Sequence, residues 1–200
     1  MTGRHGCSCI HQVVIRAAVT VRFFKILQER RWRMTPADLL TALSIKIYEP
    51  PLSEMREDCR ICDLSDPVAV LMLVIDFETE VSMSGINIFL GNSSGQYAHE
   101  TVVALQTIGA QTQAILLQKI LIVAANAGMT HDAIQADRSG LEEFSITSFQ
   151  KLHGDKWDAA SHEIQEIEAV IDYTEMMSCA ESYVERYSVQ IHQALGISLD

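Results

Sequence analysis

The sequence predicts an all-α protein, an irregular helical bundle with a central antiparallel helical hairpin. Apolar residues make up 48% of the 200 residues, which is enough to bury a sizeable core. Four prolines, ten glycines and an aromatic content of 6% favour helices over a β-sandwich or barrel. Apolar residues recur at helical spacing, as at Val102, Leu105 and Ile108, and Gly109 follows them where a helix would end.

Charge is distributed unevenly along the chain. Residues 1–33 hold seven Lys or Arg and one acid, whereas residues 34–200 hold eight Lys or Arg and 25 acids. We therefore expect a basic N-terminal extension at residues 1–33, upstream of a natural start at Met34, and a single acidic helical domain at residues 34–200. A transit peptide and a true helix packed on the domain are the alternatives for the extension. Its apolar residues are interrupted by basic ones, so none of its runs could span a membrane.

The domain begins with a predicted helix from Thr35 to about Tyr48. Pro50 and Pro51 end it, because proline cannot continue a helix. The polar segment that follows, Leu52 to Ser65, is expected to mix loop and short helix. Cys59 and Cys62 lie in this segment at the spacing of a redox or half-zinc motif, and the alternative is two ordinary thiols on one helical turn.

The next segment, Val68 to Phe77, is almost wholly apolar, and its periodicity alone does not separate a buried strand from a buried helix. Asp66 and Pro67 precede it as an N-cap residue and a first helical residue. The segment also continues to Glu80 without a turn. We therefore expect a central helix over Asp66–Val81.

A glycine- and serine-rich bend follows, and a second helix is expected over Ser93–Ile108. Ser93 and Gln96 have the spacing of a capping box, in which each side chain bonds the other residue's backbone N–H. Gly109 is expected to adopt the left-handed conformation that ends a helix. Only Gly109 and Ala110 separate this helix from the next, Gln111 to about Ala125, so the two should form the antiparallel hairpin.

The rest of the chain holds one irregular part and two predicted amphipathic helices. Thr130 to Gly154 is expected to be a short helix and a loop. The helices are expected over Lys156 to about Glu175 and over Ser178–Leu195, where apolar residues recur at helical spacing.

Several of these residues resemble the signature of a bacterial all-helical family, formerly of unknown function, whose best-known member is a DNA-mimic protein. The matching positions are Glu80-Val81, Gly85-Ile86, Phe89, Asn92-Ser93-Ser94-Gly95, Ala98, Glu100, Ala104-Leu105 and Ile108-Gly109-Ala110. The chain departs from the pattern at Met83, Ser84 and Ile86, where the family has Asn, Gly and Phe. The match is close over Asp66–Leu121 and looser over the C-terminal helices. We expect a structural motif at Glu80, Gly85, Asn92, Ser93, Gly95 and Gly109.

The acidic ridge, Asp158 to Glu185, contains eight Asp or Glu and no Lys or Arg. Glu168, Asp172 and Glu175 follow one another at the spacing of one helix face, and such neighbours lie about 5–6 Å apart. Carboxylates in such a row could imitate a phosphate backbone, and the alternative is a solvated face that keeps the protein in solution. The candidate partner-binding residues, all expected to face water, are Glu163, Glu166, Glu168, Asp172, Glu175, Glu181 and Glu185.

The resemblance implies a non-enzymatic protein that binds a DNA-binding protein, such as a transcription regulator, and that can pair as a homodimer. An acidic domain repels phosphates, so the chain should bind a basic protein and not nucleic acid. No cofactor, metal or membrane is expected, and an odd count of five cysteines indicates a reducing compartment, the cytoplasm. A metal-dependent enzyme using His and Asp or Glu groups, and a toxin-neutralising immunity protein, are the alternatives.

Other residues are candidates for metal binding or acid–base catalysis. His5, Cys7, Cys9 and His11 could bind a metal, but they lie in the extension. Three adjacent pairs, His99-Glu100, His131-Asp132 and His162-Glu163, lack the spacing that puts two imidazoles on one helix face. Asp76, Glu78 and Glu80 could form an acid–base set. Bracing of the bend by buried hydrogen bonds is the favoured interpretation for Glu80.

Overall fold

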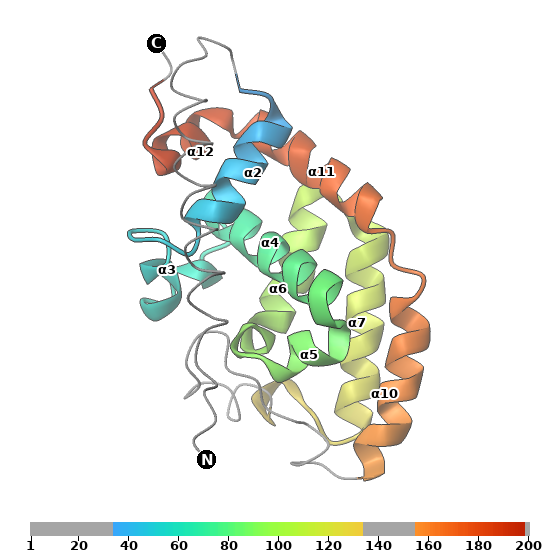
Figure 1. Cartoon of the computed structure of the whole chain (residues 1–200). Coiled ribbons are helices and arrows are strands. Elements are labelled where there is room, and N and C mark those ends of the chain that lie inside the picture. Colours follow the sequence, from blue (N-terminus) through green and yellow to red (C-terminus); the bar gives the residue numbers. More distant parts are fainter. Residues whose placement is uncertain (1–33, 134–154, 199–200) are drawn as a thin grey trace, which may run out of the picture. The chain divides into compact units, whose positions relative to one another are not determined.

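A computed structural model describes residues 34–133 and 155–198 of the chain, and these residues form helices without a strand (Figure 1). The all-α prediction is confirmed. The chain divides into two units, Met1–Thr35 and Pro36–Asp200, and every element below belongs to the second. The α-helices are α2 Pro36–Lys46, α3 Glu54–Glu57, α4 Pro67–Ser84, α5 Ile86–Gly91, α6 Ala98–Ile108, α7 Gln111–Asn126, α10 Asp155–Glu168, α11 Tyr173–Arg186 and α12 Ser188–Leu195. Two 3₁₀ helices are η1 Arg60–Cys62 and η2 Ser93–Tyr97.

Helix α4 lies at the centre of the bundle, where it packs against α5, α6, α11 and α12 (Figure 1). Asp66 caps it, because its Oδ1 accepts a hydrogen bond of 2.8 Å from the Val68 N–H, and Pro67 occupies the first turn. Every residue from Val68 to Phe77 is buried. A helix that is covered on all sides has no polar face, which is why its sequence showed no helical period.

Helices α6 and α7 pack against each other, and only Gly109 and Ala110 connect them. Gly109 has φ 95°, the left-handed conformation expected of it. The Ala110 N–H donates to the Leu105 carbonyl at 2.9 Å and the Gly109 N–H to the Gln106 carbonyl at 3.1 Å. These two bonds form a Schellman motif, which satisfies the last carbonyls of α6 and turns the chain into α7.

The segment between α4 and α6 differs from its prediction. The bend contains a short helix, α5, whose Ile86, Phe89 and Leu90 are buried, with the Phe89 ring at 5.1 Å from that of Phe77 on α4. Ser93 is the first residue of η2, and α6 begins only at Ala98, so the expected helix Ser93–Ile108 starts five residues late. Ser93 therefore opens a 3₁₀ helix, and the prediction that it begins the α-helix was wrong.

The boundaries of the C-terminal helices also differ. The predicted helices Lys156–Glu175 and Ser178–Leu195 are in fact three: α10 ends at Glu168, α11 begins at Tyr173, and α12 begins at Ser188. Helix α10 packs on α7 and α5, whereas α11 and α12 pack on α2. The break at residues 169–172 lets the chain leave one side of the bundle and cover another. The predicted extension at residues 1–33, and most of the segment Thr130–Gly154, lie outside the described residues.

Candidate functional site

The acidic ridge is carried by two helices and the link between them. Glu163 and Glu166 lie on α10, and Glu181 and Glu185 lie on α11. The expectation that Glu168, Asp172 and Glu175 share one helix face was wrong, because the helix is broken between the first and the other two. The seven candidate carboxylates therefore do not form a continuous row along one helix.

Three of the seven carboxylates are used by the fold. Glu168 accepts a hydrogen bond of 2.9 Å from the Ile86 N–H at the start of α5. Asp172 is the N-cap of α11 and accepts from the Glu175 N–H at 3.0 Å. Glu175 accepts from the amide of Gln113, a fully buried side chain on α7, at 2.8 Å. These residues fix the position of α11, so substituting them would alter the fold as well as the charge.

The other four residues, Glu163, Glu166, Glu181 and Glu185, are exposed, as Asp172 and Glu175 also are. Glu166 lies 3.6 Å from the imidazole of His162, in a pair whose side chains are 78% and 71% exposed. Such an exposed pair holds a side chain only weakly in place. No Lys or Arg interrupts the ridge, so these four carboxylates make a negative surface that solvent and a partner can reach.

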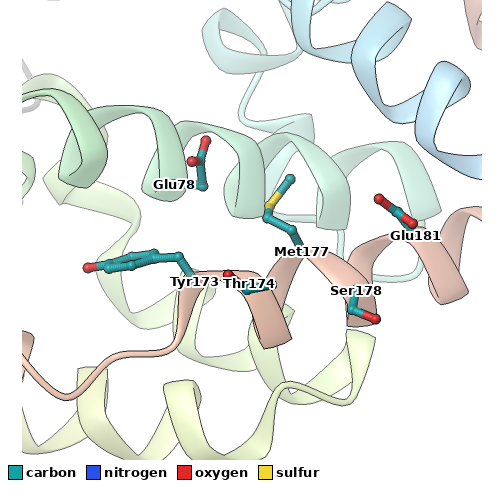
Figure 2. A pocket seen from close by; sticks show the side chains of 6 residues that line it. All are labelled: Glu78, Tyr173, Thr174, Met177, Ser178 and Glu181. Atoms are coloured by element: carbon teal, nitrogen blue, oxygen red, sulfur yellow. The ribbon is translucent and has the colours of Figure 1, made fainter.

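A pocket of about 430 Å³ lies between α4 and α11, beside the ridge (Figure 2). Glu78 of α4 stands on one side of it, and five side chains of α11 line the other. The α11 residues are Tyr173, Thr174, Met177, Ser178 and Glu181. They recur at i, i+1, i+4, i+5 and i+8, which is one face of a helix. That spacing was visible in the sequence, but the packing of this face beside α4 was not.

Tyr173 stands at one end of this pocket in an acidic setting (Figure 2). Its hydroxyl oxygen is buried and has no hydrogen-bond partner within the described part of the chain. Burial raises the pKa of Tyr173, and the carboxylates of Glu168 and Glu78 raise it further. The hydroxyl therefore stays protonated beside two negative groups, with its lone pairs available to a donor.

A buried ion pair joins α3 to the central helix. Arg56 donates to both carboxylate oxygens of Asp76 at 2.8 Å, and the two side chains are only 13% and 9% exposed. The Tyr48 hydroxyl donates to Asp76 at 3.1 Å, and burial raises the pKa of that hydroxyl. Sequence inspection did not find Arg56, because no local pattern links residues on separate helices. Asp76 therefore holds α3 against α4 through this ion pair.

Glu80 braces the turn that follows α5. Its Oε2 accepts from the Asn92 amide at 2.7 Å and its Oε1 accepts from the Ser94 hydroxyl. The backbone at Gly95 packs directly against that of Leu90, because a Cβ at position 95 would lie 2.6 Å from the Leu90 carbonyl oxygen. Burial raises the pKa of Glu80, and the two hydrogen bonds oppose that shift.

The remaining candidates do not assemble into a catalytic or metal site. Cys59 and Cys62 are free and exposed, the first just before η1 and the second its last residue. The ring centroids of His99 and His131 lie 4.3 Å apart. Across residues 34–133 and 155–198, His, Cys, Asp and Glu form no group of three that could hold a metal. None of the helices in this part is long and apolar enough to cross a membrane. The His5–His11 cluster lies outside it.

In a comparison with protein families, the chain matches a family model. The sequence model of a family described as "DMP19-like protein" matches residues 62–187. This range runs from the last residue of η1 to the end of α11, so it includes the central helix, the braced turn and the whole acidic ridge. Neither the curated proteins nor the solved structures contain a match to the chain.

Proposed function

Since the chain belongs to the family of DMP19-like proteins, whose model covers more than half of its residues, we propose that it is a non-enzymatic DNA mimic. It binds the basic surface of a DNA-binding protein, such as a transcription regulator, in place of DNA. Its carboxylates stand in for phosphates. Two copies can pair as a homodimer, which would double the negative surface offered to a partner.

The observation that carries the proposal is the exposure of four carboxylates of the acidic ridge, those of Glu163, Glu166, Glu181 and Glu185. Glu163 and Glu166 are neighbours at i, i+3, and Glu181 and Glu185 are neighbours at i, i+4. Such positions place Cβ atoms about 5–6 Å apart. Like charges at this spacing cost a helix a few tenths of a kcal/mol. A protein that keeps such carboxylates exposed on its surface retains a negative field, which attracts a basic surface over a distance.

The fold supports the proposal by holding the two acidic helices in place. Glu168, Asp172 and Glu175 add their charge to the ridge while they fix the end of α10 and the start of α11. A preorganised surface loses less conformational entropy on binding than a flexible acidic tail does. We therefore assign recognition to the four exposed carboxylates and positioning to the three that are hydrogen-bonded.

The proposal is tested by finding the partner and asking what it releases. The protein, immobilised through a tag, should retain a basic DNA-binding protein from the cell it comes from, which mass spectrometry would identify. That partner's DNA complex should dissociate when the free protein is added. Retention of a nuclease or a toxin, with no effect on a DNA complex, would favour the immunity-protein alternative and contradict this one.

A further inference from the structure

We propose that the pocket between α4 and α11 receives an arginine side chain of the basic partner. This inference rests on the proposed function, because it specifies one contact between the acidic surface and the protein that binds it. It adds a defined recess to a surface otherwise described by charge alone. The recess is lined by Glu78, Tyr173, Thr174, Met177, Ser178 and Glu181 (Figure 2).

The recess combines negative charge with apolar surface. Its volume of about 430 Å³ falls in the range of ligand pockets, about 300–1,000 Å³. Glu78 lies on α4 near Tyr173, and Glu181 lies on α11 at the other end of the recess, with Met177 between them, so a cation at either end meets a carboxylate (Figure 2). The Tyr173 ring and the Met177 thioether supply surface for the apolar part of a long side chain.

Within residues 34–133 and 155–198, no cation pairs with the carboxylates of this recess. Helix α4 contains no Lys or Arg, and the only one on α11 is Arg186 in its last turn. Glu78 accepts a hydrogen bond from Ser82 at 2.9 Å, and among the described residues neither Glu78 nor Glu181 forms an ion pair. Charge complementarity therefore points to a basic group from another molecule.

Arginine fits the recess better than lysine does. Its guanidinium is planar, carries five N–H donors, and is more weakly hydrated than an ammonium, so it can pair with a carboxylate and stack on an aromatic ring. The Tyr173 ring, at the same end of the recess as Glu78, supplies that aromatic surface (Figure 2). The negative charge of the Glu78 and Glu181 carboxylates would repel an anionic ligand from the recess.

Arginine amide is the probe for this site, and citrulline amide, whose side chain has nearly the same shape and no charge, is its control. The protein is labelled at its methionine methyl groups, and the Met177 signal is identified by its loss in Met177→Leu. We expect arginine amide to shift that signal saturably and citrulline amide to leave it unmoved. The double variant Glu78→Gln/Glu181→Gln, which removes the carboxylate at either end, should bind up to about fivefold more weakly, as expected for the loss of a part-exposed ion pair.

A matched variant separates the recess from net charge. Glu54→Gln/Glu57→Gln removes two exposed carboxylates from α3, which does not line the recess, and should leave the titration unchanged. Equal weakening in both double variants, or equal shifts with citrulline amide, would overturn the proposal. A Met177 signal that changes when the protein alone is diluted would assign the recess to a second copy of the chain, and would also overturn it. None of these outcomes depends on DNA release from a partner, so the proposed function stands or fails separately.

Discussion

The carboxylate of Glu168 accepts a hydrogen bond of 2.9 Å from the backbone N–H of Ile86, 82 positions earlier in the chain. Ile86 begins α5, and the residue before it, Gly85, has no side chain with which to cap that helix. The last residue of α10 therefore caps the first turn of α5. One carboxylate of the acidic ridge thus joins two helices.

The first prediction concerns this remote cap. Glu168→Ala removes the acceptor from a helix N-terminus and should lower the free energy of unfolding by about 1–2 kcal/mol. Glu168→Gln keeps an acceptor oxygen and should lose less. Urea denaturation measures both. Wild-type stability in the alanine variant would show that the bond does not stabilise α5.

The second prediction concerns the buried ion pair. Asp76→Ala leaves the Arg56 guanidinium without its carboxylate in a largely buried position, and this should cost about 3–5 kcal/mol. Asp58→Ala is the matched control, because the Asp58–Arg60 pair is 61% and 53% exposed and should cost under about 1 kcal/mol. Denaturation midpoints distinguish the two. Equal losses would mean that burial does not decide the strength of these pairs.

The third prediction concerns pH and Glu80. Because its pKa in the folded protein is raised above the ordinary value of 4.5, the folded state keeps this proton to a higher pH than the unfolded state does. Stability contributed by the protonated carboxyl is therefore lost as pH rises from the ordinary pKa through the raised one. Glu80→Gln does not titrate. The unfolding free energy of the wild type minus that of Glu80→Gln should fall as pH rises above the ordinary pKa of 4.5. A constant or rising difference would contradict the raised pKa.

The fourth prediction compares two apolar residues on the paired helices α6 and α7. Leu105 is fully buried, and Leu105→Ala should cost about 2–5 kcal/mol. Ile115 is 52% exposed, so Ile115→Ala should cost under about 1 kcal/mol. Thermal or urea unfolding provides the comparison. A loss below half a kcal/mol for Leu105→Ala, on the order of a surface change, would show that this face does not form the core.

Local chemistry in the sequence predicted much of the central fold. Asp66 and Pro67 mark the start of α4, and Gly109 marks the turn between α6 and α7, because a cap depends on residues within one turn of it. Helix α5 was missed because five residues between two glycines, Gly85 and Gly91, resemble a bend. What makes them helical is burial of Ile86, Phe89 and Leu90 against the rest of the bundle, and a cap from a distant residue.

The candidate site was predicted less well, for the same reason. Asp172 and Glu175 have the capping-box spacing, which signals the start of α11, but apolar residues run on across the break at residues 169–172. The identical spacing at Ser93 and Gln96 did not start an α-helix. Which carboxylates face solvent and which hold the fold depends on contacts across 59–82 positions, such as Gln113 with Asp172 and Ile86 with Glu168. The sequence pattern carries no such information.

In the proposed function, the acidic ridge competes with DNA for the basic surface of a partner. The most direct test is a competition titration of a captured partner bound to fluorescently labelled DNA, followed by anisotropy at about 50 and 200 mM salt. Wild-type protein should displace the DNA, and more weakly at the higher salt, because exposed charges are screened within about 8 Å at physiological ionic strength. Glu163→Gln/Glu166→Gln on α10 should compete less well than Glu54→Gln/Glu57→Gln on α3, a pair with the same spacing and charge change. A partner that holds DNA and this protein together, or equal competition by the two variants, would contradict the claim.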